Sequence, residues 1–125
     1  YYWVVYGFGD GINSGLYNTV APNLIRSGPD ATQDLRGFGA EGFGLTASPP
    51  TNTGGTVTPN FVDTTFGIFG TLGDSGTPGA KLLLYKNSAQ EVATESTITY
   101  GGRAGTTADA GDYQETVTFV CGGYY

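Results

Sequence analysis

Residues 112–121 read DYQETVTFVC, and this stretch decides the fold class because apolar and polar side chains alternate along it. One face of the extended segment carries Tyr113, Val117, Phe119 and Cys121, and the other face carries Gln114, Thr116 and Thr118. A period of two residues is typical of a β-strand with one buried face. We therefore expect Tyr113, Val117 and Phe119 to be buried, with Cys121 turned inward beside them.

The rest of the chain repeats this kind of signal at short intervals. Its 125 residues include 22 Gly and 6 Pro, without the Gly-X-Y period of collagen. Short apolar or alternating segments between Gly, Pro, Asn and Asp turns predict strands at 1–8, 16–20, 38–47, parts of 56–69, 80–86 and 95–101, and one helical turn at 30–35. The pattern predicts an all-β fold, a single antiparallel β-sandwich of immunoglobulin-like or pilin-like type with long Gly/Pro/Thr-rich loops. We expect residues 1–125 to form one domain, with or without residues N-terminal to Tyr1.

The N-terminal segment YYWVVYGF, residues 1–8, is apolar on both faces. A strand of this kind lies either in the centre of a sandwich or at a contact between subunits. We expect Trp3 and Val5 to be buried between two sheets, while the opposite side chains face a second packed surface. The predicted subunit interface consists of Tyr1, Tyr2, Val4, Tyr6, Phe8, Tyr124 and Tyr125. An alternative use of the aromatic residues Tyr1, Tyr2, Trp3, Tyr124 and Tyr125 is a platform on which sugar rings stack.

The charge balance narrows the classes of partner. Eleven acidic residues against five basic ones give a net charge of −6, and the basic residues are scattered singly. Because nucleic-acid binding needs a clustered basic face, we expect no nucleic-acid partner. No stretch of about 20 residues is apolar enough to span a bilayer, so we expect no membrane insertion.

Catalytic chemistry has few candidate residues in this sequence. The chain contains no His, which removes the usual general base and the commonest metal ligand. Carboxylates cluster in sequence at Asp109, Asp112 and Glu115, and again at Glu91 and Glu95. Asp residues flanking Ala-Gly are favoured in turns because their side chains bind nearby backbone N–H groups. We therefore predict a protein that is not an enzyme, with no cofactor and no metal.

Cys121 is the only cysteine, so it has no partner for a disulfide within the sequence. In an extracellular protein, an odd cysteine indicates either a disulfide to a residue outside this sequence or a buried free thiol. Both alternatives predict that Cys121 is inaccessible. The low-complexity segment 46–58 is rich in Thr and Pro, and is either a solvated loop or a site for O-linked sugar.

The C-terminal segments STITY, residues 96–100, and AGDYQETVTFV, residues 110–120, resemble the closing hairpin of spore coat protein U-like domains. These domains include the subunits of archaic chaperone-usher pili. The resemblance covers about a quarter of the chain. It implies an extracellular structural subunit of a cell-surface filament, whose partners are copies of itself and whose polymerisation depends on β-strand contacts between subunits. The alternatives are an adhesin module that binds host or surface glycans or a receptor, and a virion decoration protein.

Overall fold

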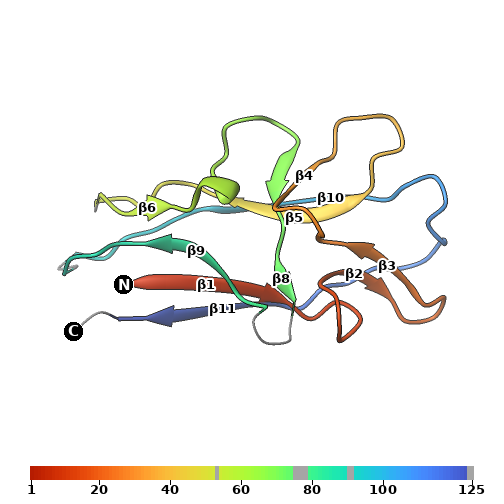
Figure 1. Cartoon of the computed structure of the whole chain (residues 1–125), viewed down its shortest axis with the longest axis horizontal. Coiled ribbons are helices and arrows are strands. Elements are labelled where there is room, and N and C mark those ends of the chain that lie inside the picture. Colours follow the sequence, from red (N-terminus) through yellow and green to blue (C-terminus); the bar gives the residue numbers. More distant parts are fainter. Residues whose placement is uncertain (53, 75–78, 90–91, 124–125) are drawn as a thin grey trace.

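The computed structural model describes residues 1–52, 54–74, 79–89 and 92–123, and within them the chain is all-β and sandwich-like (Figure 1). This confirms the predicted fold class. The described residues form eleven strands and one short 3-10 helix, η1 (Pro59–Phe61). The strands are β1 (Tyr2–Gly7), β2 (Gly15–Asn18), β3 (Asn23–Arg26), β4 (Thr32–Asp34), β5 (Gly42–Ala47), β6 (Thr56–Val57), β7 (Ile68–Gly70), β8 (Gly73–Asp74), β9 (Lys81–Tyr85), β10 (Ile98–Arg103) and β11 (Val117–Gly122).

The first large sheet has the strand order β11-β1-β9-β6, and β8 pairs with the end of β1. Its central strand β1 is antiparallel to β11 and β9 and parallel to β8, and it pairs with β11 without interruption from Tyr2 opposite Gly122 to Gly7 opposite Val117. The N-terminal strand expected at 1–8 is therefore a central strand of its own sheet. Because β1 and β11 are antiparallel neighbours, the two ends of the chain lie at the same end of the molecule (Figure 1).

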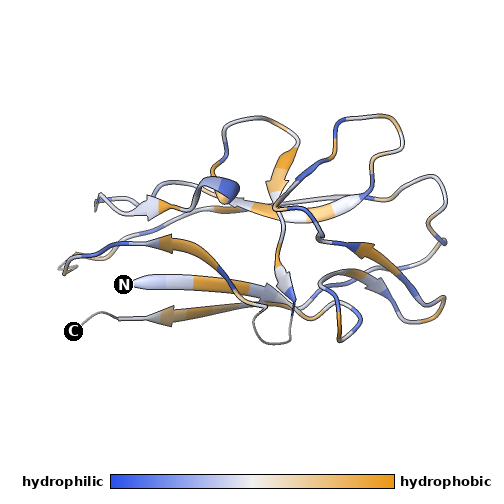
Figure 2. Cartoon of the chain, viewed as in Figure 1, coloured by the Kyte–Doolittle hydropathy of each residue, from blue (hydrophilic) through white to orange (hydrophobic). Residues whose placement is uncertain are grey.

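The second large sheet has the order β10-β5-β7-β4, and β2 and β3 form a separate hairpin. Apolar side chains from both large sheets share one core, which explains why Figure 2 shows hydrophobic colour along β5, β9 and the middle of β1. The buried members of this core are Val5, Phe43, Leu45, Ala47, Val57, Phe61, Leu72, Leu83 and Leu84. Val5 is fully buried, as its position between the sheets predicts.

Several boundaries differ from the sequence prediction because long-range pairing overrides local preference. The predicted helical turn at 30–35 is wrong, since Thr32–Asp34 pairs with β7 more than thirty residues away. Strand β3 lies in residues 22–36, a stretch without strand pattern that the sequence predicts to be a surface connection, and it forms because β2 is available as a partner. The C-terminal strand begins at Val117 and not at Asp112, and Gln114 forms only an isolated bridge to Tyr17.

Glu115, directly before β11, ties the start of this strand to the loop after β1. Its Oε1 accepts the N–H of Gly9 at 2.6 Å, and its Oε2 accepts the N–H of Gly15 at 2.5 Å. Gly9 has φ +53°, and a side chain there would collide with the carbonyl oxygen of Asn13. Hydrogen bonds from backbone N–H groups to a carboxylate are strong. This connection therefore fixes the register of β11 against β1.

Candidate subunit interface

The outward side of the β11-β1-β9 sheet is apolar and lies opposite the sandwich core. Val4 pairs with Val120 on one side and with Leu82 on the other. Because directly paired residues point to the same face of a sheet, all three side chains lie on its outward side. Leu82 is 41% exposed and Val120 45% exposed, although both are large hydrophobic residues in strands. We call this surface the outer apolar face, and its members are Tyr2, Val4, Tyr6, Leu82, Tyr85 and Val120.

An irregularity in β9 determines which of its leucines reach this face. The register between β1 and β9 shifts between Trp3 and Val4, so Leu83 is an extra residue on the β9 side. Leu83 and Leu84 are both buried, whereas Leu82 is turned outward. The apolar run within residues 80–86 predicts a buried strand, with Leu82 and Leu84 on one side and Leu83 on the other, and this prediction fails at Leu82. The sequence carries no signal for the bulge.

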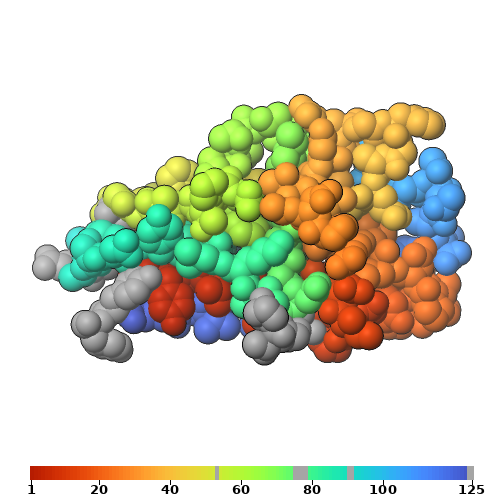
Figure 3. Space-filling view, viewed as in Figure 1, coloured from red at the N-terminus to blue at the C-terminus, as the bar shows by residue number. Residues whose placement is uncertain are grey.

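The outer apolar face is ordered by close packing among its own residues. The ring of Tyr2 lies over Gly122, where an added Cβ would come within 2.1 Å of the ring. An aromatic side chain lying over a strand glycine on the neighbouring strand stabilises the pairing and fills the missing volume. In the space-filling view, side chains of β1 reach the surface between those of β9 and β11 (Figure 3).

Charge is absent from the outer apolar face. None of its members is an Asp, Glu, Lys or Arg, although the chain as a whole carries a net charge of −6. Tyr2, Val4 and Tyr6 of the predicted interface belong to this face, and Trp3 and Val5 lie on the opposite side of β1. Phe8 follows the strand and is 56% exposed, while Tyr124 and Tyr125 lie outside the described residues.

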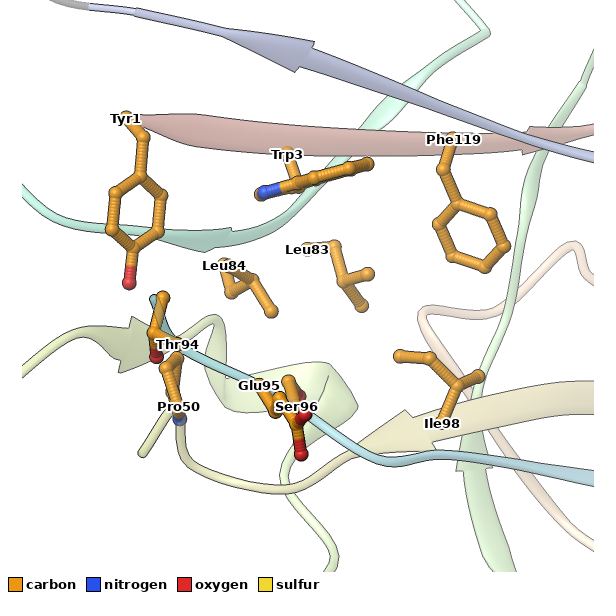
Figure 4. A pocket seen from close by; sticks show the side chains of 10 residues that line it. All are labelled: Tyr1, Trp3, Pro50, Leu83, Leu84, Thr94, Glu95, Ser96, Ile98 and Phe119. Atoms are coloured by element: carbon orange, nitrogen blue, oxygen red, sulfur yellow. The ribbon is translucent and has the colours of Figure 1, made fainter. Parts of the chain in front are cut away.

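Between the two large sheets, beside the chain ends, a cleft of about 220 Å³ is open to solvent. The ring of Tyr1, directly before β1, points across it toward Thr94, the ring of Phe119 in β11 points toward Ile98, and Trp3 lies between them (Figure 4). Trp3 is 37% exposed, so it is less buried than predicted. The hydroxyl oxygen of Tyr1 is buried and has no hydrogen-bond partner among the described residues. The sequence does not predict this cleft, because Pro50 and Thr94 come from segments without strand pattern. Glu95 and Ser96 also line it, since the strand predicted at 95–101 begins only at Ile98.

The structure corrects two predictions, the aromatic platform for sugars and the buried thiol of Cys121. Tyr1 and Trp3 face the cleft while Tyr2 lies on the outer apolar face, so these three rings do not form one platform for sugars. Cys121 is exposed and its thiol is free, so the prediction of a buried thiol is wrong. Cys121 does lie on the inward side, opposite Trp3, and Trp3 is itself partly exposed there. A disulfide to a residue outside this sequence stays a prediction.

Two of the acidic residues in the sequence clusters, Glu115 and Asp109, take part in hydrogen bonds that hold the fold together. Both carboxylate oxygens of Glu115 accept backbone N–H groups, and the backbone oxygen of Asp109 accepts the hydroxyl of Tyr113 at 2.7 Å. Glu91 lies outside the described residues. Within the part of the chain that the structure describes, no group of three His, Cys, Asp or Glu side chains is placed to hold a metal ion. In the same part, no helix is long and apolar enough to cross a membrane.

No protein-family model matches the chain, and the comparisons with curated proteins and with solved structures gave no match. The resemblance of residues 96–120 to spore coat protein U-like domains therefore stays a prediction from the sequence.

Proposed function

We propose that this protein is a structural subunit of an extracellular filament or surface assembly, held together by contacts between the strands of neighbouring subunits. The observation that supports this proposal is the outer apolar face, which is continuous across β9, β1 and β11 and carries no charge. Large exposed apolar patches on a folded protein commonly mark interaction sites. The extracellular location is inferred from the resemblance of the C-terminal hairpin.

Electrostatics favours this face over the others as a contact between copies. Two copies that each carry −6 repel one another over most of their surfaces. The repulsion is smallest where neither copy presents a carboxylate, and burial of Leu82, Val120 and the tyrosine rings then contributes favourable free energy. The proposal therefore predicts that a single charge on this face weakens assembly.

The test compares the wild type with Val120→Lys and with a matched control, Thr99→Lys. Val120 lies on the outer apolar face and Thr99 is an exposed residue of β10 in the other sheet. Sedimentation and electron microscopy over a range of concentrations should show assemblies for the wild type and Thr99→Lys, and mainly monomer for Val120→Lys. A wild-type protein that stays monomeric at every concentration would contradict the proposal.

A glycan- or receptor-binding module is the second candidate, and the open cleft favours it. Apolar rings line the cleft, and the partnerless hydroxyl of Tyr1 offers a polar group to a ligand. Trp3 is the only tryptophan, so its fluorescence reports directly on the cleft. Saturable fluorescence change and a raised melting temperature with a member of a glycan panel would favour this function over assembly. No change with any glycan, together with assembly of the wild type, would favour the structural subunit.

A further inference from the structure

The terminal strands of the two large sheets differ in how they are protected from pairing with another chain. Strand β6 has two residues, and β4 has three, with Asp34 paired to Arg36 beside it. Strand β10 has six residues but includes two adjacent glycines and ends at Arg103. Short length and charge are the usual devices that keep sheet edges from pairing, and glycine weakens a strand.

Strand β11 is neither short nor charged, and its single glycine, Gly122, is its last residue. Its six residues, VTFVCG, contain no charge and no Pro, and its pairing with β1 has no bulge. No described strand lies on its other side. A long, flat and apolar edge of this kind is a template for another strand.

The backbone groups on the outward side of this edge follow from the hydrogen-bond pattern. The N–H of Phe8 donates to the carbonyl oxygen of Thr116 at 3.0 Å, which makes Phe8 and Thr116 a hydrogen-bonded pair. Such pairs alternate along an antiparallel ladder, so even-numbered residues of β11 bond to β1. The N–H and C=O groups of Val117, Phe119 and Cys121 therefore point toward the unpaired side.

These three residues suit an antiparallel partner of the same sequence. In a two-fold arrangement centred on Phe119, Val117 of one copy lies opposite Cys121 of the other, and the two Phe119 residues lie opposite one another. All three outward-facing residues then pair, whereas a register centred on either neighbouring residue leaves one of them beyond the end of the partner strand. The two-fold axis is perpendicular to the sheet, so the outer apolar faces of both copies lie on the same side and become one surface.

We infer that β11 pairs with β11 of a second copy of this chain, antiparallel and centred on Phe119. This inference rests on the proposed function, since it names the strand contact through which subunits join. The pair joins two first sheets into one, and the combined outer apolar face is left for further contacts. Charge supports a second copy as the partner, because β11 and the outer apolar face present no carboxylate to another chain of charge −6.

The test uses the native Cys121 together with Val117→Cys under mild oxidation, followed by a non-reducing gel. Paired strands hold the two thiols at an effective concentration in the millimolar range, so at about 10 μM protein the cross-link should form about a hundredfold faster than by random collision. The Cα separation of an antiparallel pair suits a disulfide. Two controls should cross-link slowly, because each places only one thiol in every facing pair. They are the wild type, with Cys121 opposite Val117, and the double variant Val117→Cys/Cys121→Ser, in which the introduced thiol lies opposite the introduced hydroxyl.

A second pair of variants tests the backbone contact itself. Cys121→Pro removes an outward N–H, and a proline is compatible with an edge strand at such a position. This variant should stay folded and lose the association. Val120→Pro removes an inward N–H and should unfold the β1–β11 pairing. If Cys121→Pro does not fold, Cys121→Lys serves instead, because a lysine on the edge opposes pairing through its charge.

The outcomes separate this inference from the proposed function. Pairing of β11 is supported if Val117→Cys cross-links fast while both controls cross-link slowly, and if Cys121→Pro or Cys121→Lys loses the association. Assembly of the wild type without faster cross-linking of Val117→Cys overturns the pairing and leaves the structural function in place. Rapid cross-linking of the wild type overturns the register, and a monomer in all samples overturns both proposals.

Discussion

The two faces of the first sheet are made of similar residues but have different surroundings. On the inner face, Val5 and Leu83 are almost completely buried under the second sheet, whereas Leu82 and Val120 on the outer face are more than two-fifths exposed. Both faces are apolar because β1 is apolar at nearly every position. Apolar residues on the inner face therefore stabilise the fold, while the same residue types on the outer face remain accessible to solvent.

The largest effect on stability is expected at Glu115, which determines which residues of β11 lie on each face of the sheet. A one-residue slip of β11 against β1 would exchange its two faces, and Glu115 prevents it by binding Gly9 and Gly15. Glu115→Ala should lower the free energy of unfolding by about 3 kcal/mol, since it removes three charge-assisted hydrogen bonds, from Gly9, Gly15 and Thr116, and leaves their N–H groups without these acceptors. Urea denaturation measures the change.

A matched control is Glu41→Ala. The Oε1 of Glu41 accepts only the N–H of Gly105, at 3.1 Å and in an exposed position. Its loss should change the unfolding free energy by about 0.5 kcal/mol or less. Equal effects of the two substitutions would show that Glu115 does not fix the register of β11.

Adjacent leucines in β9 test the comparison directly. Leu83→Ala should lower the free energy of unfolding by about 3 kcal/mol, because it leaves a cavity in the core. Leu82→Ala should lower it by about 1 kcal/mol or less, because its side chain is already 41% exposed. Assembly should show the opposite order, with Leu82→Ala the weaker assembler at a temperature where both variants are folded. Similar stabilities for the two variants would remove the distinction between the faces.

The reactivity of the Cys121 thiol tests whether the inner face of the first sheet is solvent-accessible at the end of β11. Because Cys121 is exposed at the end of β11, a thiol reagent should label the native monomer at nearly the rate found in denaturant. Dilute protein is the appropriate sample, since pairing of β11 would protect the thiol. Slow labelling of a monomer would show that the second sheet covers the end of the first.

The smallest effect is expected at the charged edge of the other sheet. The Arg36 guanidinium donates to Asp34 and lowers the pKa of that carboxyl to about 2. A lowered carboxyl pKa contributes stability that is present above the ordinary value of 3.8 and is lost as the pH falls toward 2. Both side chains are about half exposed, so solvent screens the pair. Wild type and Asp34→Asn should differ slightly in urea midpoint at neutral pH and converge near pH 2.

The sequence predicts the fold class and the two faces of β1 because period-two alternation depends only on local spacing. It does not predict the bulge that turns Leu82 outward, since the bulge arises from pairing between β1 and β9. The sequence correctly predicts that Cys121 lies on the inner side of β11. It does not predict that Cys121 is exposed, because burial depends on which distant segments lie over that part of the strand. Strands β3 and β4 were missed for a similar reason, as each is short and forms only beside its partner.

The adjacency of the two chain ends has a mechanical consequence. Tyr2 pairs with Gly122 at the first position of an antiparallel ladder, so the start of β1 and the end of β11 lie side by side at one end of the molecule (Figure 1). A force that pulls the two ends apart loads the β1–β11 hydrogen bonds one pair at a time, as in opening a zipper, and does not load them together in shear. Tension applied through the ends would therefore separate β11 from β1 at low force, exposing the side of β1 that it covers before the rest of the sandwich yields.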